Sequence, residues 1–370
     1  MSAGSGSPVV SLAQRAEADV TPPPERRGST LLRHLGYTVV AGVVLYFATY
    51  QLEPFRNYQL ATMAAYLCAT AGLTVLVGQS GQLSLGHGAF MAVGAYTVAL
   101  MQNKFSDSGT TGSWTLLVSL ALGVLLTVVV GAVVGLAAAR LRGPYLAGVT
   151  LAIAVTVPAI ATTFDETFNG DQGLPVYVDP PPESLGLSFP NEQWQAWLAL
   201  IAALLTMLLL ANLGRSRLGR SFRAVRDDEI AAQLSGIALA RTQVLAFVVS
   251  AACAGLSGGM FGVLSQSVSP SAFGLNLSLF LLLAVVVGGL GSLAGAVWGA
   301  VLLVVLPQLT ESVTDQLTLS PAAEQRLEGN LPLAIFGLTL IVVMIAAPGG
   351  IQGLVRRIAR WSRAARKAAD

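Results

Sequence analysis

The chain has 370 residues, of which 54% are hydrophobic and only 11% are charged. Soluble domains carry about 25% charged residues, so this composition excludes a water-soluble globular protein. The net charge of +2 gives no indication of nucleic acid, and we expect no nucleic-acid partner.

The first 34 residues are rich in serine, glycine, proline and charge, with three consecutive prolines at 22–24. They lack the basic start, apolar core and small-residue cleavage site of a signal peptide. We therefore predict that residues 1–34 form a disordered cytoplasmic tail.

Apolar runs follow that are long enough to cross the roughly 30 Å of hydrocarbon in a bilayer. They lie near residues 35–52, 58–77, 83–101, 115–139, 144–163, 194–211, 243–264, 275–291, 294–310 and 331–347. The sequence thus predicts an all-α fold, a polytopic membrane helix bundle of about ten transmembrane helices. Some of these segments are short enough to be broken or re-entrant. Cys68 and Cys253 both fall within runs, where we expect them to pack rather than bind metal or form a disulfide.

The charged residues between the runs indicate the orientation, because arginine and lysine collect on the cytoplasmic side of membrane proteins. Loop 164–193 has six acidic and no basic residues, whereas segment 213–242 has six arginines and the C-terminal tail is also basic. Ten spans with both termini in the cytoplasm place every basic segment inside. We therefore predict a transmembrane domain at 35–347 with an acidic extracytoplasmic loop at 164–193, a cytoplasmic loop at 213–242 and a basic cytoplasmic tail at 348–370.

None of the ten runs contains Asp, Glu, Lys or Arg. Because ionisable residues within the membrane are typical of proton relays, their absence argues against a proton-driven carrier, although sodium coupling through carbonyls and hydroxyls stays open. The two lysines, Lys104 and Lys367, do not follow glycine, which excludes a phosphate-binding P-loop. If ATP drives this chain, the nucleotide must bind another polypeptide.

A glycine-rich polar stretch interrupts the apolar sequence at 77–96. Its glycines permit an unwound backbone, which membrane proteins tolerate where it lines a cavity. We interpret Gln82, Ser84 and His87 as the wall of a path for a polar solute. The alternative is a short loop at the cytoplasmic surface followed by a closely packed helix.

A weaker echo of this stretch lies at 265–273, where Ser271 and Phe273 are further candidates for the same path. By the predicted topology the echo lies on the opposite side of the membrane, as an inverted repeat of five spans would require. A second glycine-rich stretch, 287–300, is better explained by close helix packing.

The loop at 213–242 has the features of a docking element. A carboxylate at Asp227 or Asp228 can cap a short helix at 229–235, and Gly236 suits the end of that helix. The residues expected to contact a partner are Arg220, Phe222, Arg223, Arg226, Asp228, Glu229 and Gly236. The alternative is an ordinary basic loop beside anionic lipid, which would need neither cap nor terminal glycine.

Four segments resemble one family in its own order along the chain. They are Gly-Gln-Leu-Ser-Leu-Gly-His-Gly-Ala-Phe (81–90), Phe-Arg-Ala-Val-Arg-Asp-Asp-Glu-Ile-Ala-Ala (222–232), Val-Gly-Gly-Leu-Gly-Ser-Leu-Ala-Gly-Ala (287–296) and Ala-Pro-Gly-Gly-Ile (347–351). Together they resemble the LivM-type permeases of bacterial branched-chain amino acid ABC importers, from about residue 35 to 357.

The resemblance implies a non-enzymatic subunit of the bacterial inner membrane that carries no cofactor. Its expected partners are a LivH-like second permease, two cytoplasmic ATPase subunits that bind ATP and Mg, an extracytoplasmic solute-binding protein and membrane lipid. The resemblance also implies that the segment around 220–237 sits in a cleft of the ATPase.

The solute is less tightly specified than the subunit type. An uncharged path suits leucine, isoleucine or valine, and it suits urea, short-chain amides or another small neutral solute nearly as well. A self-contained, ion-coupled secondary transporter is the alternative from another class, and it predicts uptake by this chain alone.

Overall fold

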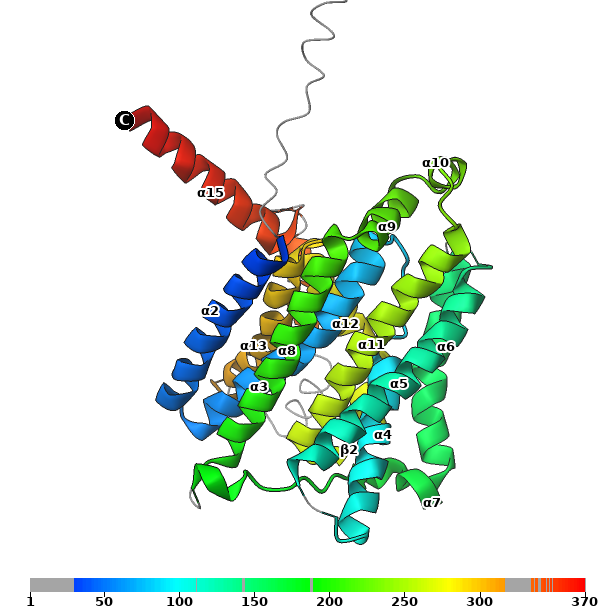
Figure 1. Cartoon of the computed structure of the whole chain (residues 1–370), viewed down its shortest axis with the longest axis vertical. Helices are drawn as coiled ribbons and strands as arrows, with labels where there is room; N and C mark the ends of the chain where they lie inside the picture. The colour runs from blue at the N-terminus through cyan, green and yellow to red at the C-terminus, as the bar shows by residue number, and fades with distance from the viewer. Residues whose placement is uncertain are drawn as a thin grey trace, which may run out of the picture.

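The structure, a computed structural model, describes residues 30–316 with gaps at 111, 142–143 and 187–188, parts of 334–349, and residues 350–369. Most of the described chain is helical (Figure 1). The long helices are α2 (Thr30–Gln51), α3 (Pro54–Leu73), α4 (His87–Asp107), α5 (Ser113–Ala138), α6 (Pro144–Thr163), α8 (Asn191–Arg215), α11 (Leu239–Ser265), α12 (Leu275–Gly289), α13 (Leu293–Gln316) and α15 (Gly350–Ala369).

Shorter elements connect these helices. A π-helical segment, η1 (Thr74–Gln79), extends α3, and two short helices follow α8, namely α9 (Arg217–Asp227) and α10 (Glu229–Leu234). The remaining elements are α7 (Asp165–Phe168), η2 (Gly170–Gln172), η3 (Glu183–Leu185), η4 (Pro270–Phe273) and two strands, β1 (Leu174–Pro175) and β2 (Ser267–Val268), which pair antiparallel.

Seven of the described helices are long and apolar enough to cross a membrane, and Leu293–Leu309 is a shorter apolar helix. The predicted polytopic helical bundle is therefore confirmed in its class. The last predicted span, 331–347, is described only in part, and most of the N-terminal tail and residues 317–333 lie outside the described residues.

Helix α11 lies between α8 and α5 in the centre of the bundle (Figure 1). Small residues bring its neighbours close. A Cβ added to Gly255 of α11 would lie 2.5 Å from Oγ1 of Thr127 on α5, and Gly94 of α4 lies against the backbone of Gly255. Membrane helices use such small residues to pack at short range. Cys68 and Cys253 are free and buried, as predicted for packing residues.

The two ends of the bundle differ in charge. At one end, which we call the basic end, lie α9 and α10 with the arginines of segment 213–242, and α15 begins there too (Figure 1). At the opposite, acidic end lie α7 and the β1–β2 pair, with the acids of loop 164–193 (Figure 1). This separation follows the charge pattern from which the orientation was predicted.

Candidate translocation path and coupling segment

Residues 80–86, between η1 and α4, form a non-helical segment that we call the first interruption. It begins at the basic end, where Nη1 of Arg226 donates a hydrogen bond of 2.8 Å to the carbonyl oxygen of Gly78. Gly81 has a φ of +73°, and a Cβ there would lie 2.9 Å from Cγ of Arg226. The side chain of Arg226 thus lies against the start of the interruption.

The first interruption ends deep in the bundle, at the start of α4. His87 is fully buried, and its Nε2 lies 2.7 Å from Oγ of Ser250 on α11. The backbone amide of Gly88 donates a hydrogen bond of 2.9 Å to Oγ of Ser278 on α12. These contacts fix the first turn of α4 between two other helices.

Residues 266–274, between α11 and α12, form a second interruption that enters from the acidic end. The helix that follows it, α12, has 15 residues. At 1.5 Å per residue its length is about 22 Å, which is shorter than the bilayer core. A Cβ on Gly88 would lie 2.9 Å from the carbonyl oxygen of Phe273 and 3.2 Å from that of Gly274. The two interruptions therefore enter from opposite ends and meet inside the bundle.

The predicted path residues differ in their surroundings. Gln82, Ser84, His87 and Phe273 are buried, whereas Ser271 is exposed in η4. The structure brings the start of α4 close to Phe273, because Gly88, the residue after His87, lies against the carbonyl oxygen of Phe273. Ser271 is not among the nearest contacts of Gly88. Their role in a path stays a prediction.

Several buried polar atoms in the first interruption and at His87, the first residue of α4, lack a hydrogen-bond partner among the described residues. They are Oγ of Ser80, both amide atoms of Gln82 and Nδ1 of His87. A buried polar atom without a partner costs about 1–3 kcal/mol. This concentration of unpartnered polar atoms distinguishes the segment from the apolar packing around it.

Helix α9 is attached to the bundle by one face. Phe222 is fully buried and Val225 is 2% exposed, while Nη1 of Arg223 donates a hydrogen bond of 2.8 Å to the carbonyl oxygen of Gly214. Arg226 is paired with Asp227 at 2.7 Å, and Arg220 reaches the carbonyl oxygen of Arg215 at 3.2 Å. Phe222, predicted as a partner contact, therefore holds α9 against the bundle.

Helix α10 is capped at both ends by its own residues. Oδ1 of Asp228 accepts hydrogen bonds from the amides of Ile230 and Ala231, at 2.8 and 3.0 Å, so that of the two predicted candidates, Asp227 and Asp228, the second is the N-cap. At the other end Gly236 has a φ of +82°, and the amide of Ile237 donates to a carbonyl oxygen one turn back. This is the glycine-ended stop expected from the sequence.

The apolar residues of α10 are turned outward. Ile230 is 72% and Leu234 is 85% exposed, unlike the buried Phe222 and Val225 of α9. The apolar residues of α9 and α10 therefore do not share one contact surface. Instead, α9 faces the bundle and α10 presents its apolar side to the surroundings, beside Glu229, whose carboxylate lies 3.5 Å from Nε2 of Gln243.

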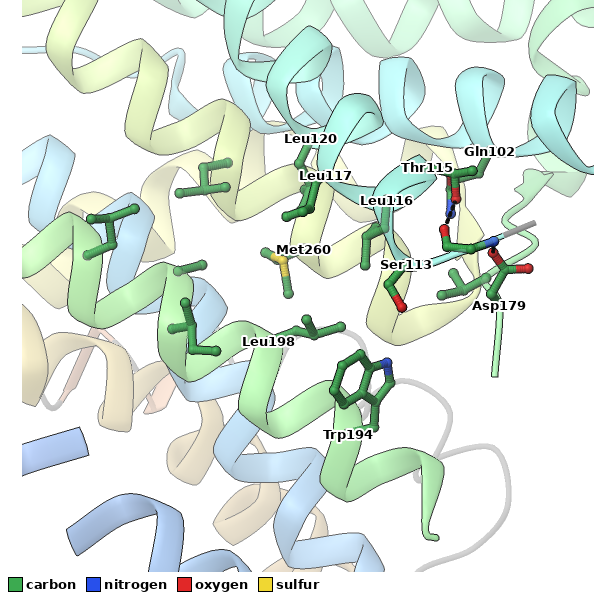
Figure 2. A pocket seen from close by; sticks show the side chains of 16 residues that line it. Gln102, Ser113, Thr115, Leu116, Leu117, Leu120, Asp179, Trp194, Leu198 and Met260 are labelled. Carbon is green, nitrogen blue, oxygen red and sulfur yellow. Dashed lines mark hydrogen bonds between the residues drawn. The ribbon is translucent and has the colours of Figure 1, made fainter. Parts of the chain in front are cut away.

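A cavity of about 340 Å³ lies between α5, α8 and α11, with a polar end and an apolar floor. Figure 2 shows Gln102 and Asp179 at one end, and Met260 and Trp194 along the rest. Oδ2 of Asp179 accepts a hydrogen bond of 2.6 Å from the amide of Gly112. Sequence reasoning missed this cavity because its lining comes from segments far apart in the chain.

The helical bundle, whose buried residues include no Asp, Glu, Lys or Arg in the described part of the chain, and the capped basic segment at one end are features of a membrane permease. A family model described as "Branched-chain amino acid transport system / permease component" matches residues 57–347. The chain therefore belongs to this family of transport-system permeases. It is a multi-pass protein of the bacterial cell membrane, and its role is transport rather than catalysis.

The curated relatives agree with this assignment. The LivM permease protein of Salmonella typhimurium is 32% identical over 324 residues, covering 81% of this chain and 71% of that protein. LivM of Escherichia coli K12 is 31% identical over 353 residues, covering 89% and 77%. LivH of Salmonella typhimurium is 25% identical over 301 residues, covering 78% and 92%. No solved structure matches the chain.

Proposed function

We propose that this chain moves leucine, isoleucine and valine across the inner membrane as one permease of an ATP-driven importer. The observation that supports this substrate class is the match of residues 57–347 to the branched-chain amino acid permease family. The uncharged interior supports it, since a solute without net charge needs no ionised partner within the membrane.

The proposed assembly contains a LivH-like second permease, two cytoplasmic ATPase subunits and an extracytoplasmic solute-binding protein. ATP and Mg bind the ATPase subunits, because this chain has no P-loop lysine. Ten spans put both termini, the coupling loop 213–242 and the tail 348–370 in the cytoplasm, and the acidic loop 164–193 outside. The arginines gathered at the basic end support this orientation.

The coupling step follows from the contact between α9 and the first interruption. Arg226 joins two segments 148 residues apart in the chain, the partner-facing loop and the carbonyl of Gly78. When the ATPase displaces α9 and α10, this hydrogen bond transmits the displacement to the interruption. The polar atoms of Gln82 and His87 then exchange their buried setting for contact with the solute.

A reconstitution experiment tests the substrate and the energy source. The purified chain, its second permease, the ATPase subunits and the binding protein are placed in proteoliposomes, and uptake of labelled leucine is measured with isoleucine, valine or urea as competitor. We expect ATP-dependent uptake that isoleucine and valine inhibit and urea does not. Uptake by this chain alone, driven by an ion gradient, would instead establish the secondary transporter.

Thiol labelling tests the path. Cysteines are introduced at Gln82, Ser84 or His87, with Thr127→Cys as a control because Thr127 is equally buried but packs between α5 and α11. We expect a small water-soluble thiol reagent to label the first three in one nucleotide state and the control in none. Three unreactive positions in every state would support helix packing instead of a path.

A further inference from the structure

The C-terminal helix α15 separates apolar from basic residues along its length. Positions 351, 354, 355 and 358 are apolar, and the sequence continues this spacing with Trp361 and Ala365. Such intervals of three and four residues place side chains on one side of a helix. Most of the basic residues fall on the other side by the same register, and they are Arg356, Arg357, Arg360, Arg363, Arg366 and Lys367.

The first turns of α15 are fixed to the basic end of the bundle. Nε1 of Trp298 on α13 donates a hydrogen bond of 3.1 Å to Oε1 of Gln352. Nη2 of Arg356 donates one of 3.0 Å to Oγ of Ser292, in the turn between α12 and α13. From this attachment α15 runs crosswise to α2 and α8 and away from α9 and α10 (Figure 1).

Three apolar residues of α15 are exposed, whereas Ile351, in its first turn, is half-buried. Leu354 is 44%, Val355 is 41% and Ile358 is 58% exposed. A helix that runs crosswise to the membrane-spanning helices, at their end, has the direction of a helix parallel to the membrane surface. Interfacial helices have this combination of an apolar side and a strongly basic side.

We propose that α15 lies in the headgroup layer of the membrane and binds anionic phospholipid. The apolar side enters the boundary with the acyl chains, and the basic side meets lipid phosphates. Charge supports lipid as the occupant, because within Gly350–Ala369 the sequence has six basic residues and no acidic one. The direction of α15 supports it too, because α15 leads away from α10, the helix proposed to contact the ATPase (Figure 1).

Spin labelling of the full chain tests this placement. Cys68 and Cys253 are replaced by alanine, and a nitroxide is attached at Ile358→Cys or, on the opposite side, at Arg360→Cys. The chain is placed in nanodiscs of phosphatidylcholine with or without phosphatidylglycerol. With phosphatidylglycerol, we expect the label at 358 to be accessible to oxygen and protected from a water-soluble nickel chelate, and the label at 360 to show the reverse.

Two sets of variants separate lipid binding from simple burial. Ala365→Asp adds a charge on the apolar side and is expected to abolish protection at 358, whereas Ala364→Asp adds the same charge on the other side and retains most of it. The triple change Arg360→Gln, Arg363→Gln and Lys367→Gln, which preserves the apolar side and helix propensity, is expected to remove the effect of phosphatidylglycerol. Each basic residue near an anionic surface changes membrane affinity about fivefold.

Two outcomes would overturn the proposal. One is equal nickel accessibility at 358 with and without phosphatidylglycerol. The other is protection at 358 that arises only when the ATPase subunits are added, because α15 would then be a protein-docking helix. The nanodisc has the same lipids in both leaflets and involves no transport, so a failure of the proposed transport function would leave this result unchanged.

Discussion

Replacing Gly236 with alanine tests whether the capped helix α10 couples transport to its motor. Gly236 has a φ of +82°, and an added Cβ would meet no atom within 4 Å. The change therefore acts through the backbone alone, since a left-handed conformation costs a residue other than glycine roughly 1–2 kcal/mol. An energy of this size changes the ratio of capped to frayed α10 by about 5–30-fold.

The assay compares leucine uptake and ATP hydrolysis in proteoliposomes that contain the complete importer. For Gly236→Ala we expect fewer leucine molecules transported per ATP hydrolysed, with assembly of the complex retained. Gly36→Ala is the matched control, because its added Cβ also meets no atom within 4 Å and its φ is ordinary for a helix. Gly236→Asn should restore part of the coupling, since asparagine tolerates the left-handed conformation better than alanine.

The reasoning fails if Gly236→Ala transports as much leucine per ATP as Gly36→Ala. It also fails if the alanine and asparagine variants lose coupling to the same degree, because the loss would then come from the side chain rather than the backbone angle.

Three further predictions rest on single contacts. Asp228→Ala should cost α10 about 1 kcal/mol and accelerate hydrogen exchange at the two capped amides, while Asp228→Ser should preserve their protection; equal exchange in both variants would exclude the cap as the cause. Gly88→Ala would place a Cβ 2.8 Å from a side-chain oxygen of α12, and we expect overpacking of about 1–3 kcal/mol, visible as a lower thermal unfolding midpoint in detergent; an unchanged midpoint would contradict the close approach. Arg226→Gln should break the link to Gly78 and leave ATP hydrolysis without uptake, whereas Arg217→Gln, which removes an exposed arginine of the same helix outside segment 220–237, should transport normally; identical behaviour would refute the proposed transmission.

The caps of α10 could be predicted from the sequence because they are local. Asp228 needs only the backbone amides that follow it, and Gly236 needs only its own dihedral angles. The burial of Phe222 could not be predicted in this way. Its neighbours come from the bundle, and a short basic segment gives no sign of which apolar side chain faces inward.

The start of α4 shows a different limit of prediction from sequence. The predicted span began at residue 83, whereas the helix begins at His87, because hydropathy does not distinguish a helix from an extended segment buried at the same depth. The glycines of the first interruption suggested an unwound backbone. Its meeting with Phe273, far along the chain, depends on tertiary packing. The cavity with Gln102 and Asp179 is likewise lined by segments far apart in the chain, so no local sequence pattern predicts it.

The caps of α10 have a thermodynamic consequence for any protein that contacts it. Because Asp228 and Gly236 fix the helix within this chain, the entropy lost on ordering it belongs to folding and not to association. The exposed Leu234 and Ile230 are already held in place on a preorganised surface. Complex formation then loses mainly the rotamer freedom of a few side chains, so more of the free energy of the contact remains as binding affinity.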